Sequence, residues 1–153
     1  DNKEYSDLFL ECGGKEGKVH KAIVCMQSPY LAVISEDNTR TVRNAVNISL
    51  TSGDAGIIDA LVQFMYTFNY AASAGTPVNS NRGALTFNVA VYTAAEKFGI
   101  QPLARLATSR FCSLAKQRWD TADFCCSIRA LYSLAPNSAR AMNITVVEVA
   151  AAH

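Results

Sequence analysis

The two histidines of this sequence, His20 and His153, limit the nucleophilic chemistry that the chain could perform. A Ser/His/Asp or a Cys/His site needs a histidine as its base. Because His153 is the last residue of the sequence, such a site would have to use His20. The question of enzymatic function therefore depends on whether other reactive groups accompany His20.

The cysteines are the other candidates for chemistry, either as metal ligands or as nucleophiles. A zinc site needs four suitably spaced ligands, and the sequence contains no Cys-x-x-Cys pair. On a helix, the adjacent Cys125 and Cys126 would point about 100° apart and could not easily share one ion. We expect packing cysteines with free thiols, because the number is odd and the chain is not rich in cysteine. The five are Cys12, Cys25, Cys112, Cys125 and Cys126.

Free thiols indicate a reducing compartment, so we expect an intracellular protein, cytoplasmic or nuclear. The pair Gly13-Gly14 is not followed by the spacing of a phosphate-binding loop, and we interpret it as a hairpin turn. The acidic pair Glu36-Asp37 is expected on a solvated surface. With no usable histidine, metal or phosphate arrangement, the sequence predicts no catalytic residue, no cofactor and no metal, and a small enzyme is the remotest hypothesis.

Charge and hydropathy exclude two further classes of partner. The formal net charge is +1 and the basic residues are scattered, whereas a nucleic-acid binder usually carries a basic stripe. No run of 18 apolar residues is present, so no membrane span is expected. The start, Asp1 to Glu4, does not resemble a signal peptide. At 153 residues, half of them apolar, the chain fits one globular domain.

Alternation of apolar and polar residues predicts strands from Tyr5 to Cys12 and from Val46 to Leu50, the first in a hairpin. Ser28-Pro29 is a helix start, with Ser28 as N-cap, and residues 51–54 should cap another helix. We expect that helix to bury Ile58, Leu61, Val62 and Met65. The strands come mainly before the helices, which predicts an α+β fold rather than a βαβ repeat.

The second half of the sequence reads as helices. One runs from Leu85 to Phe98 with Gly99 as a left-handed C-cap, and the next begins at Gln101-Pro102. Asp120 or Thr121 should cap a helix to Leu134 that points Phe124, Ile128, Leu131 and Tyr132 inward. Residues 138–151 favour a helix, although the β-branched residues Ile144 to Val147 leave a strand open. The aromatic stretch 66–70 suits a short strand or an extended cap, and residues 71–83 form the longest loop.

Three blocks of residues in the correct order resemble BTB/POZ domains, and they cover about residues 5–115. The first block contains Ser6-Asp7-Leu8, Val19-His20-Lys21-Ala22 and Ser28-Pro29-Tyr30. The second is Phe64-Met65-Tyr66-Thr67 with Tyr70, and the third is Ala95-Glu96-Lys97-Phe98-Gly99-Ile100 with Leu103 and Ala107. The tail from Trp119 is similar to the helix pair that follows the domain in fungal members.

The resemblance implies a helical cluster flanked by a small, mainly three-stranded sheet, with further helices at the C-terminal end. It implies a BTB/POZ domain at residues 5–115 and a helical extension at 116–153 packed on it. It also places His20 at a helix entrance, where its ring would hydrogen-bond backbone and fix the hairpin. Gly17 departs from the family, which usually has an aromatic residue there. Because seven residues precede Leu8, we expect no exchanged N-terminal strand.

The function that the resemblance implies is protein–protein interaction, as an adaptor that self-associates as a homodimer and recruits a partner protein. In dimeric relatives, residues matching Asp7 and Lys21 lie in a charged pocket near the dimer groove, and here such a pair could serve a partner or only the fold. The alternative is a substrate adaptor of a cullin-based ubiquitin ligase. Relatives often use a hydrophobic-x-Glu element for that scaffold, but no Glu stands between Phe68 and Leu85. The candidate interaction residues are Asp7, Lys21, Ile23, Val24, Tyr30, Leu31, Ile34, Phe68 and Tyr70.

Overall fold

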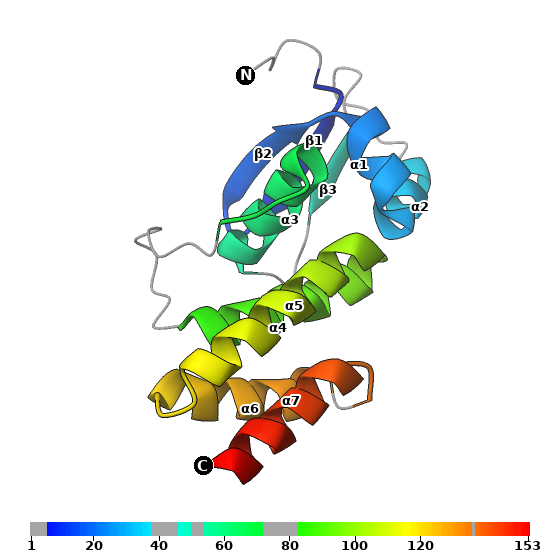
Figure 1. The fold of residues 1–153 in the computed structure, drawn as a ribbon. Helices are drawn as coiled ribbons and strands as arrows, with labels where there is room; N and C mark the ends of the chain where they lie inside the picture. The colour runs from blue at the N-terminus through cyan, green and yellow to red at the C-terminus, as the bar shows by residue number, and fades with distance from the viewer. Residues whose placement is uncertain (1–5, 38–45, 50–53, 72–82, 136) are drawn as a thin grey trace. The chain divides into compact units, whose positions relative to one another are not determined.

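The computed structural model describes residues 6–37, 46–49, 54–71, 83–135 and 137–153. The chain divides into two compact units. The first comprises Asp1–Ala71 with Lys97–Ile100, and the second comprises Ala72–Glu96 with Gln101–His153. The strands and the first three helices lie in the first unit, whereas the second unit is helical (Figure 1). This content confirms the α+β class.

The sheet of the first unit contains β1 (Leu8–Cys12), β2 (Lys15–Val19) and β3 (Val46–Ser49), in the order β2-β1-β3. β1 pairs antiparallel with β2 and parallel with β3. The hairpin between β1 and β2 turns at Gly13 and Gly14, both of which have positive φ values, 57° and 79°. A two-residue turn with two positive φ values requires residues without a Cβ penalty, so the predicted hairpin is confirmed.

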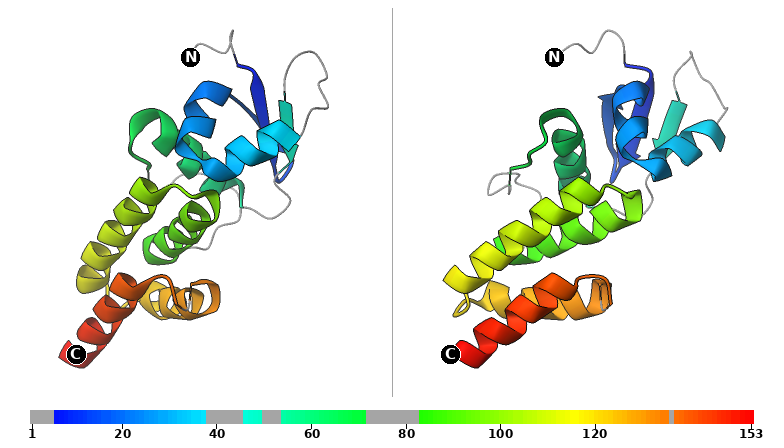
Figure 2. Two further views of the ribbon diagram at one scale, coloured as in Figure 1. Left: turned by 90° about the vertical axis from the view of Figure 1, so that its right-hand side faces the viewer. Right: turned by 45° about the vertical axis from the view of Figure 1, so that its right-hand side comes forward.

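Three helices accompany the sheet: α1 (Lys21–Gln27), α2 (Pro29–Asp37) and α3 (Ala55–Thr67). The two views of Figure 2 show α1 and α2 next to each other, and their residues are in contact. The predicted caps are confirmed. The Ser28 hydroxyl accepts the main-chain N–H of Leu31 at 3.2 Å, and the Asp54 carboxylate accepts that of Gly56 at 2.9 Å.

The aromatic end of α3 differs from its prediction. The helix continues to Thr67 and Phe68 ends it as a left-handed C-cap with φ of 55°, so residues 66–68 are neither strand nor extended cap. The buried side of α3 is also rotated slightly from the predicted one, because Ile58 and Val62 are only half-buried. The buried residues are Ile57, Ala60, Leu61, Phe64 and Met65.

The second unit is built from α4 (Ala84–Phe98), whose last two residues belong to the first unit, α5 (Gln101–Gln117), α6 (Ala122–Leu134) and α7 (Arg140–Ala152). α7 packs against both α5 and α6. The predicted ends are confirmed at Gly99, with φ of 71°, and at Thr121, whose hydroxyl accepts the Phe124 N–H. The final segment is a helix, and it buries Met142, Thr145, Val146 and Val149 at helical spacing.

One prediction for this unit is wrong, and others fall on residues that the structure does not describe. Tyr132 was expected inward but is 52% exposed, because the buried side of α6 runs through Phe124, Ser127 and Leu131. The predicted loop at residues 71–83 lies mostly outside the described residues, as do residues 51–53 of the predicted cap.

A carboxylate from α6 fixes the start of α4. Asp123 accepts the main-chain N–H groups of Leu85, at 2.8 Å, and Thr86, at 3.2 Å, and the hydroxyl of Thr86 at 2.7 Å. Gly83 permits this approach, since a Cβ there would lie 2.0 Å from the Asp123 Cγ. The N-terminal N–H groups of α4 are therefore capped by a residue almost forty positions away.

Candidate functional site

The entrance to α1 is held by two side chains from other elements. Asp7, just before β1, accepts the main-chain N–H of Lys21 at 2.7 Å. The sequence brought these residues together as a charged pair, but the contact that the structure shows involves the Lys21 backbone. Asp7 thus serves as a helix cap, and its charge complements the positive N-terminal end of α1.

His20 lies at the entrance of α1, as the resemblance implied, but its ring partner is a side chain rather than backbone. The Tyr66 hydroxyl lies 2.9 Å from the His20 main-chain nitrogen and 2.8 Å from its Nδ1. The main-chain N–H can only donate, so the hydroxyl oxygen accepts there and its own proton is free to be donated to Nδ1. The pair joins the end of β2 to α3 and has a structural role.

The junction between α1 and α2 is also fixed by polar contacts. The Gln27 amide donates to the Met65 carbonyl at 2.7 Å, and the buried Ser28 hydroxyl donates to the Phe98 carbonyl at 2.6 Å. The ring of Tyr30 meets that of Phe98 edge to face, with centroids 5.0 Å apart. Both helices have fewer than three turns, so these contacts position them more firmly than helix propensity could.

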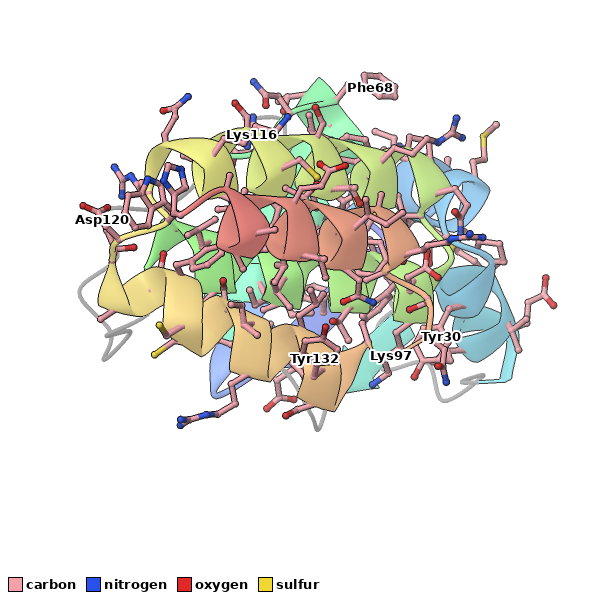
Figure 3. All side chains as sticks on the ribbon, turned by 60° about the horizontal axis from the view of Figure 1, so that its bottom comes forward. Tyr30, Phe68, Lys97, Lys116, Asp120 and Tyr132 are labelled. Carbon is pink, nitrogen blue, oxygen red and sulfur yellow. The ribbon has the colours of Figure 1, made fainter. Side chains whose placement is uncertain are left out.

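The structure separates the predicted interaction residues by exposure. Asp7 and Phe68 are exposed, and Figure 3 shows the Phe68 ring projecting from the end of α3. Lys21, Ile23, Tyr30 and Ile34 are half-buried. The other three belong to the core rather than to an exposed surface, with exposed fractions of 0% for Val24, 1% for Leu31 and 2% for Tyr70.

Two exposed apolar residues of α1 and α2 were missed by the sequence analysis. Met26 is 87% exposed and Val33 is 59% exposed. Helical spacing contains the signal that could have found them, because each stands three positions after a half-buried residue, Ile23 or Tyr30. Val24 follows Ile23 by one position, and Leu31 follows Tyr30 by one position. One position turns a side chain by about 100° around the helix axis, which places Val24 and Leu31 in the core. We call the five residues that follow the helical spacing the α1–α2 surface: Ile23, Met26, Tyr30, Val33 and Ile34.

Comparison with known protein families matches residues 1–114 to the BTB/POZ domain. This chain belongs to the BTB/POZ family. The match covers the first unit together with α4 and most of α5, and it stops before α6 and α7. The domain boundary that we place at residue 115, with a helical extension after it, stays a prediction.

BTB/POZ domains are protein-interaction domains, so the general role of this chain is to bind other proteins. The family is not typically enzymatic. Within the described residues, no three His, Cys, Asp or Glu side chains are grouped so that they could hold a metal ion. In the same part of the chain, no helix has the length and apolar character needed to cross a bilayer.

The thiols of this BTB/POZ domain differ in their surroundings. Burial raises the pKa of the Cys12 thiol on β1, and the negative charges of Asp54 and Asp59 raise it further. Cys125 and Cys126 lie exposed on α6. Cys12 is therefore held in its neutral form, as expected for a packing residue.

Proposed function

We propose that this BTB/POZ domain is an adaptor that self-associates through the α1–α2 surface and recruits a partner protein. The observation that carries this proposal is the exposure of Met26 and Val33, at 87% and 59%. Both lie on short helices whose ends are fixed by the hydrogen bonds of Asp7, Gln27 and Ser28. An intracellular setting, cytoplasmic or nuclear, is part of the proposal and is supported by the free thiols.

The composition of the α1–α2 surface suits such a contact. Its side chains are apolar or aromatic, the classes that are enriched at the centres of protein interfaces. Met26 has a flexible thioether that adapts to irregular partner surfaces. The ends of α1 and α2 are already fixed by hydrogen bonds of Asp7, Gln27 and Ser28. Association would therefore not have to order these helices, which lowers the entropic cost of binding.

The experiment is a measurement of molar mass by light scattering on a sizing column, at several protein concentrations. We expect a dimer of the 16.5 kDa chain, and Val33→Asp should convert it to monomer by placing a charge in an apolar contact. Val147→Asp is the matched control, because Val147 is 60% exposed on α7, outside the α1–α2 surface. A monomeric wild type, or equal effects of the two substitutions, would refute self-association through this surface.

A second function, substrate adaptor of a cullin-based ubiquitin ligase, is favoured by Phe68. Its ring is 71% exposed, on a left-handed backbone with φ of 55°. A non-glycine residue in that conformation costs about 1 kcal/mol, and such strain concentrates at binding sites. An exposed aromatic residue at a helix end is the kind of anchor that a scaffold could bind.

Co-elution with a cullin N-terminal domain tests this second function. Phe68→Gly is the informative variant, because glycine relieves the left-handed strain while removing the ring. We expect the variant to keep its thermal stability and to lose binding. The control is Tyr132→Ala, which removes an exposed aromatic side chain from α6. If the wild-type chain does not co-elute, the cullin alternative is wrong.

A further inference from the structure

On the outer edge of β2, some main-chain groups are not paired by any strand in the described part of the chain, and the register of the hairpin identifies them. In a two-residue hairpin, the residues that flank the turn, here Cys12 and Lys15, form a hydrogen-bonded pair. Hydrogen-bonded and non-hydrogen-bonded pairs then alternate, so Gly17 bonds to Leu10 while Glu16 and Lys18 point their N–H and C=O groups away from β1. In the described part of the chain, no strand pairs with that side of β2.

The hairpin places two negative charges directly opposite each other. Glu16 stands directly opposite Glu11 in a non-hydrogen-bonded pair, the kind in which side chains lie closest. Like charges in that position destabilise a hairpin. Both residues are exposed, and neither has an opposite charge facing it across β1 and β2, since Lys18 faces Phe9 with its ammonium 5.4 Å from the ring centroid.

We propose that β2 pairs with β2 of a second copy of this chain, antiparallel and centred on Gly17. In that register, Glu16 lies opposite Lys18 of the second copy, and Lys18 lies opposite its Glu16. The two main-chain positions that point outward become two hydrogen-bonded pairs with four N–H···O=C bonds. The contact is twofold and self-complementary, as closed dimers require.

Charge decides between this register and its neighbours. Because only Glu16 and Lys18 point their main-chain groups outward, the pairing can shift only by two residues. One such shift places Glu16 opposite Glu16 of the other copy, and the opposite shift places Lys18 opposite its Lys18, so both bring like charges together. Lysine on an edge strand normally prevents indiscriminate pairing. Here the sequence Glu16-Gly17-Lys18 leaves one register in which two attractive pairs form, and that register also brings a lysine close to the Glu11–Glu16 pair.

Gly17 itself fits the centre of such a seam. It shares the buried face of the hairpin with Leu10, and nothing but the Leu10 carbonyl oxygen, at 3.8 Å, would meet a Cβ there. A groove of about 320 Å³ runs beside it between the hairpin and α3, lined by the half-buried Ile58 and Val62 among others. Two facing glycines would add no side chain on that side of the sheet, so the grooves of the two copies would adjoin.

The edge is separate from the α1–α2 surface, so the test is made in a Val33→Asp background in which the first contact is removed. Molar mass is measured by sedimentation between roughly 10 µM and 1 mM, because a five-residue strand pair is a small, weak interface. We expect the mass to rise with concentration. Glu16→Lys and Lys18→Glu should each weaken this association by at least about tenfold, since two attractive pairs become repulsive.

Mixing the two variants provides the decisive step. A Glu16→Lys chain and a Lys18→Glu chain are complementary in the proposed register, so the mixture should form heterodimers although neither variant associates alone. Glu16→Lys should also raise the thermal stability of the isolated chain, because it removes the repulsion with Glu11. A Val33→Asp chain that stays monomeric at 1 mM, or a mixture that stays monomeric, would overturn the β2 proposal. Neither result would affect self-association through the α1–α2 surface, which the wild-type mass tests separately.

Discussion

The two units of this chain hold their helices by different means. In the first unit, α1 and α2 are short, and polar contacts spread over Asp7, His20, Gln27 and Ser28 position them. In the second unit, longer helices pack through apolar faces, and one carboxylate, Asp123, makes three hydrogen bonds at the start of α4. The difference indicates that the polar contacts positioning α1 and α2 are spread over several side chains, whereas at the start of α4 they are concentrated in one carboxylate.

The largest expected effect concerns that carboxylate. Gly83→Ala would place a Cβ 2.0 Å from the Asp123 Cγ, so the carboxylate must move away from α4. We expect a loss of about 3 kcal/mol in the free energy of unfolding, because a helix cap with several charge-assisted bonds is broken. Chemical denaturation measures this loss. Gly56→Ala is the control, with its nearest atom 3.4 Å away, and similar losses for both variants would contradict the single-contact description.

In the first unit, Ser28 should give the next largest effect. Ser28→Ala removes the donor to the Phe98 carbonyl and the acceptor of the Leu31 N–H, both at a fully buried position. We expect about 2 kcal/mol of destabilisation, because buried polar groups are left without partners. Ser133→Ala, at an exposed hydroxyl of α6, should change stability little. Equal losses of stability in the two variants would contradict the claim that the hydrogen bonds of Ser28 stabilise the junction of α1 and α2.

Tyr66→Phe should have a smaller effect in the same unit. The substitution removes the hydroxyl that contacts the His20 main chain and Nδ1 but keeps the ring. We expect a loss of about 1 kcal/mol, the usual net contribution of such hydrogen bonds. Thermal unfolding of the variant beside Tyr132→Phe measures it, and unchanged stability would show that the link from β2 to α3 is dispensable.

The smallest effect concerns Cys12 and pH. Because burial raises the pKa of this thiol, folding favours its neutral form, and that contribution to stability is present below the ordinary thiol pKa. As pH rises through the ordinary and then the raised pKa, the contribution is lost. Alkaline pH should therefore destabilise wild type more than Cys12→Ala, as measured by denaturation at neutral and alkaline pH. A Cys125→Ala variant, altered at an exposed thiol, should follow wild type.

Local caps and turns were read correctly from the sequence, whereas of the long-range contacts only the proximity of Asp7 and Lys21 was expected, and that expectation came from the resemblance. Ser28, Thr121 and the Gly13-Gly14 turn act within a few residues of their own positions, so residue type was sufficient to predict them. The caps provided by Asp7 and Asp123 depend on elements that meet only in the folded chain. A sequence that contains an acidic residue gives no indication of which distant helix start it will reach.

The predicted interaction residues also show that the sequence did not reveal which apolar side chains are buried. Val24 and Leu31 were grouped with Ile23 and Tyr30 because all four are apolar, but a one-position step on a helix separates core from surface. Tyr70 is buried although it follows the exposed Phe68 by two positions. The left-handed backbone at Phe68 changes the direction of the chain there. The residue type did not indicate this turn, because glycine or asparagine is the usual residue in that conformation.

Oxidation of Met26 tests self-association through the α1–α2 surface most directly. Met26 is 87% exposed, whereas the other two methionines, Met65 and Met142, are 2% and 0% exposed and serve as internal references. The chain is treated with a short pulse of hydroxyl radicals at low and at high protein concentration, and methionine sulfoxide is quantified by peptide mass spectrometry. We expect Met26 to be oxidised more slowly in the associated protein, while Met65 and Met142 are oxidised slowly at both concentrations. Equal oxidation of Met26 in the monomeric and associated protein would contradict self-association through the α1–α2 surface.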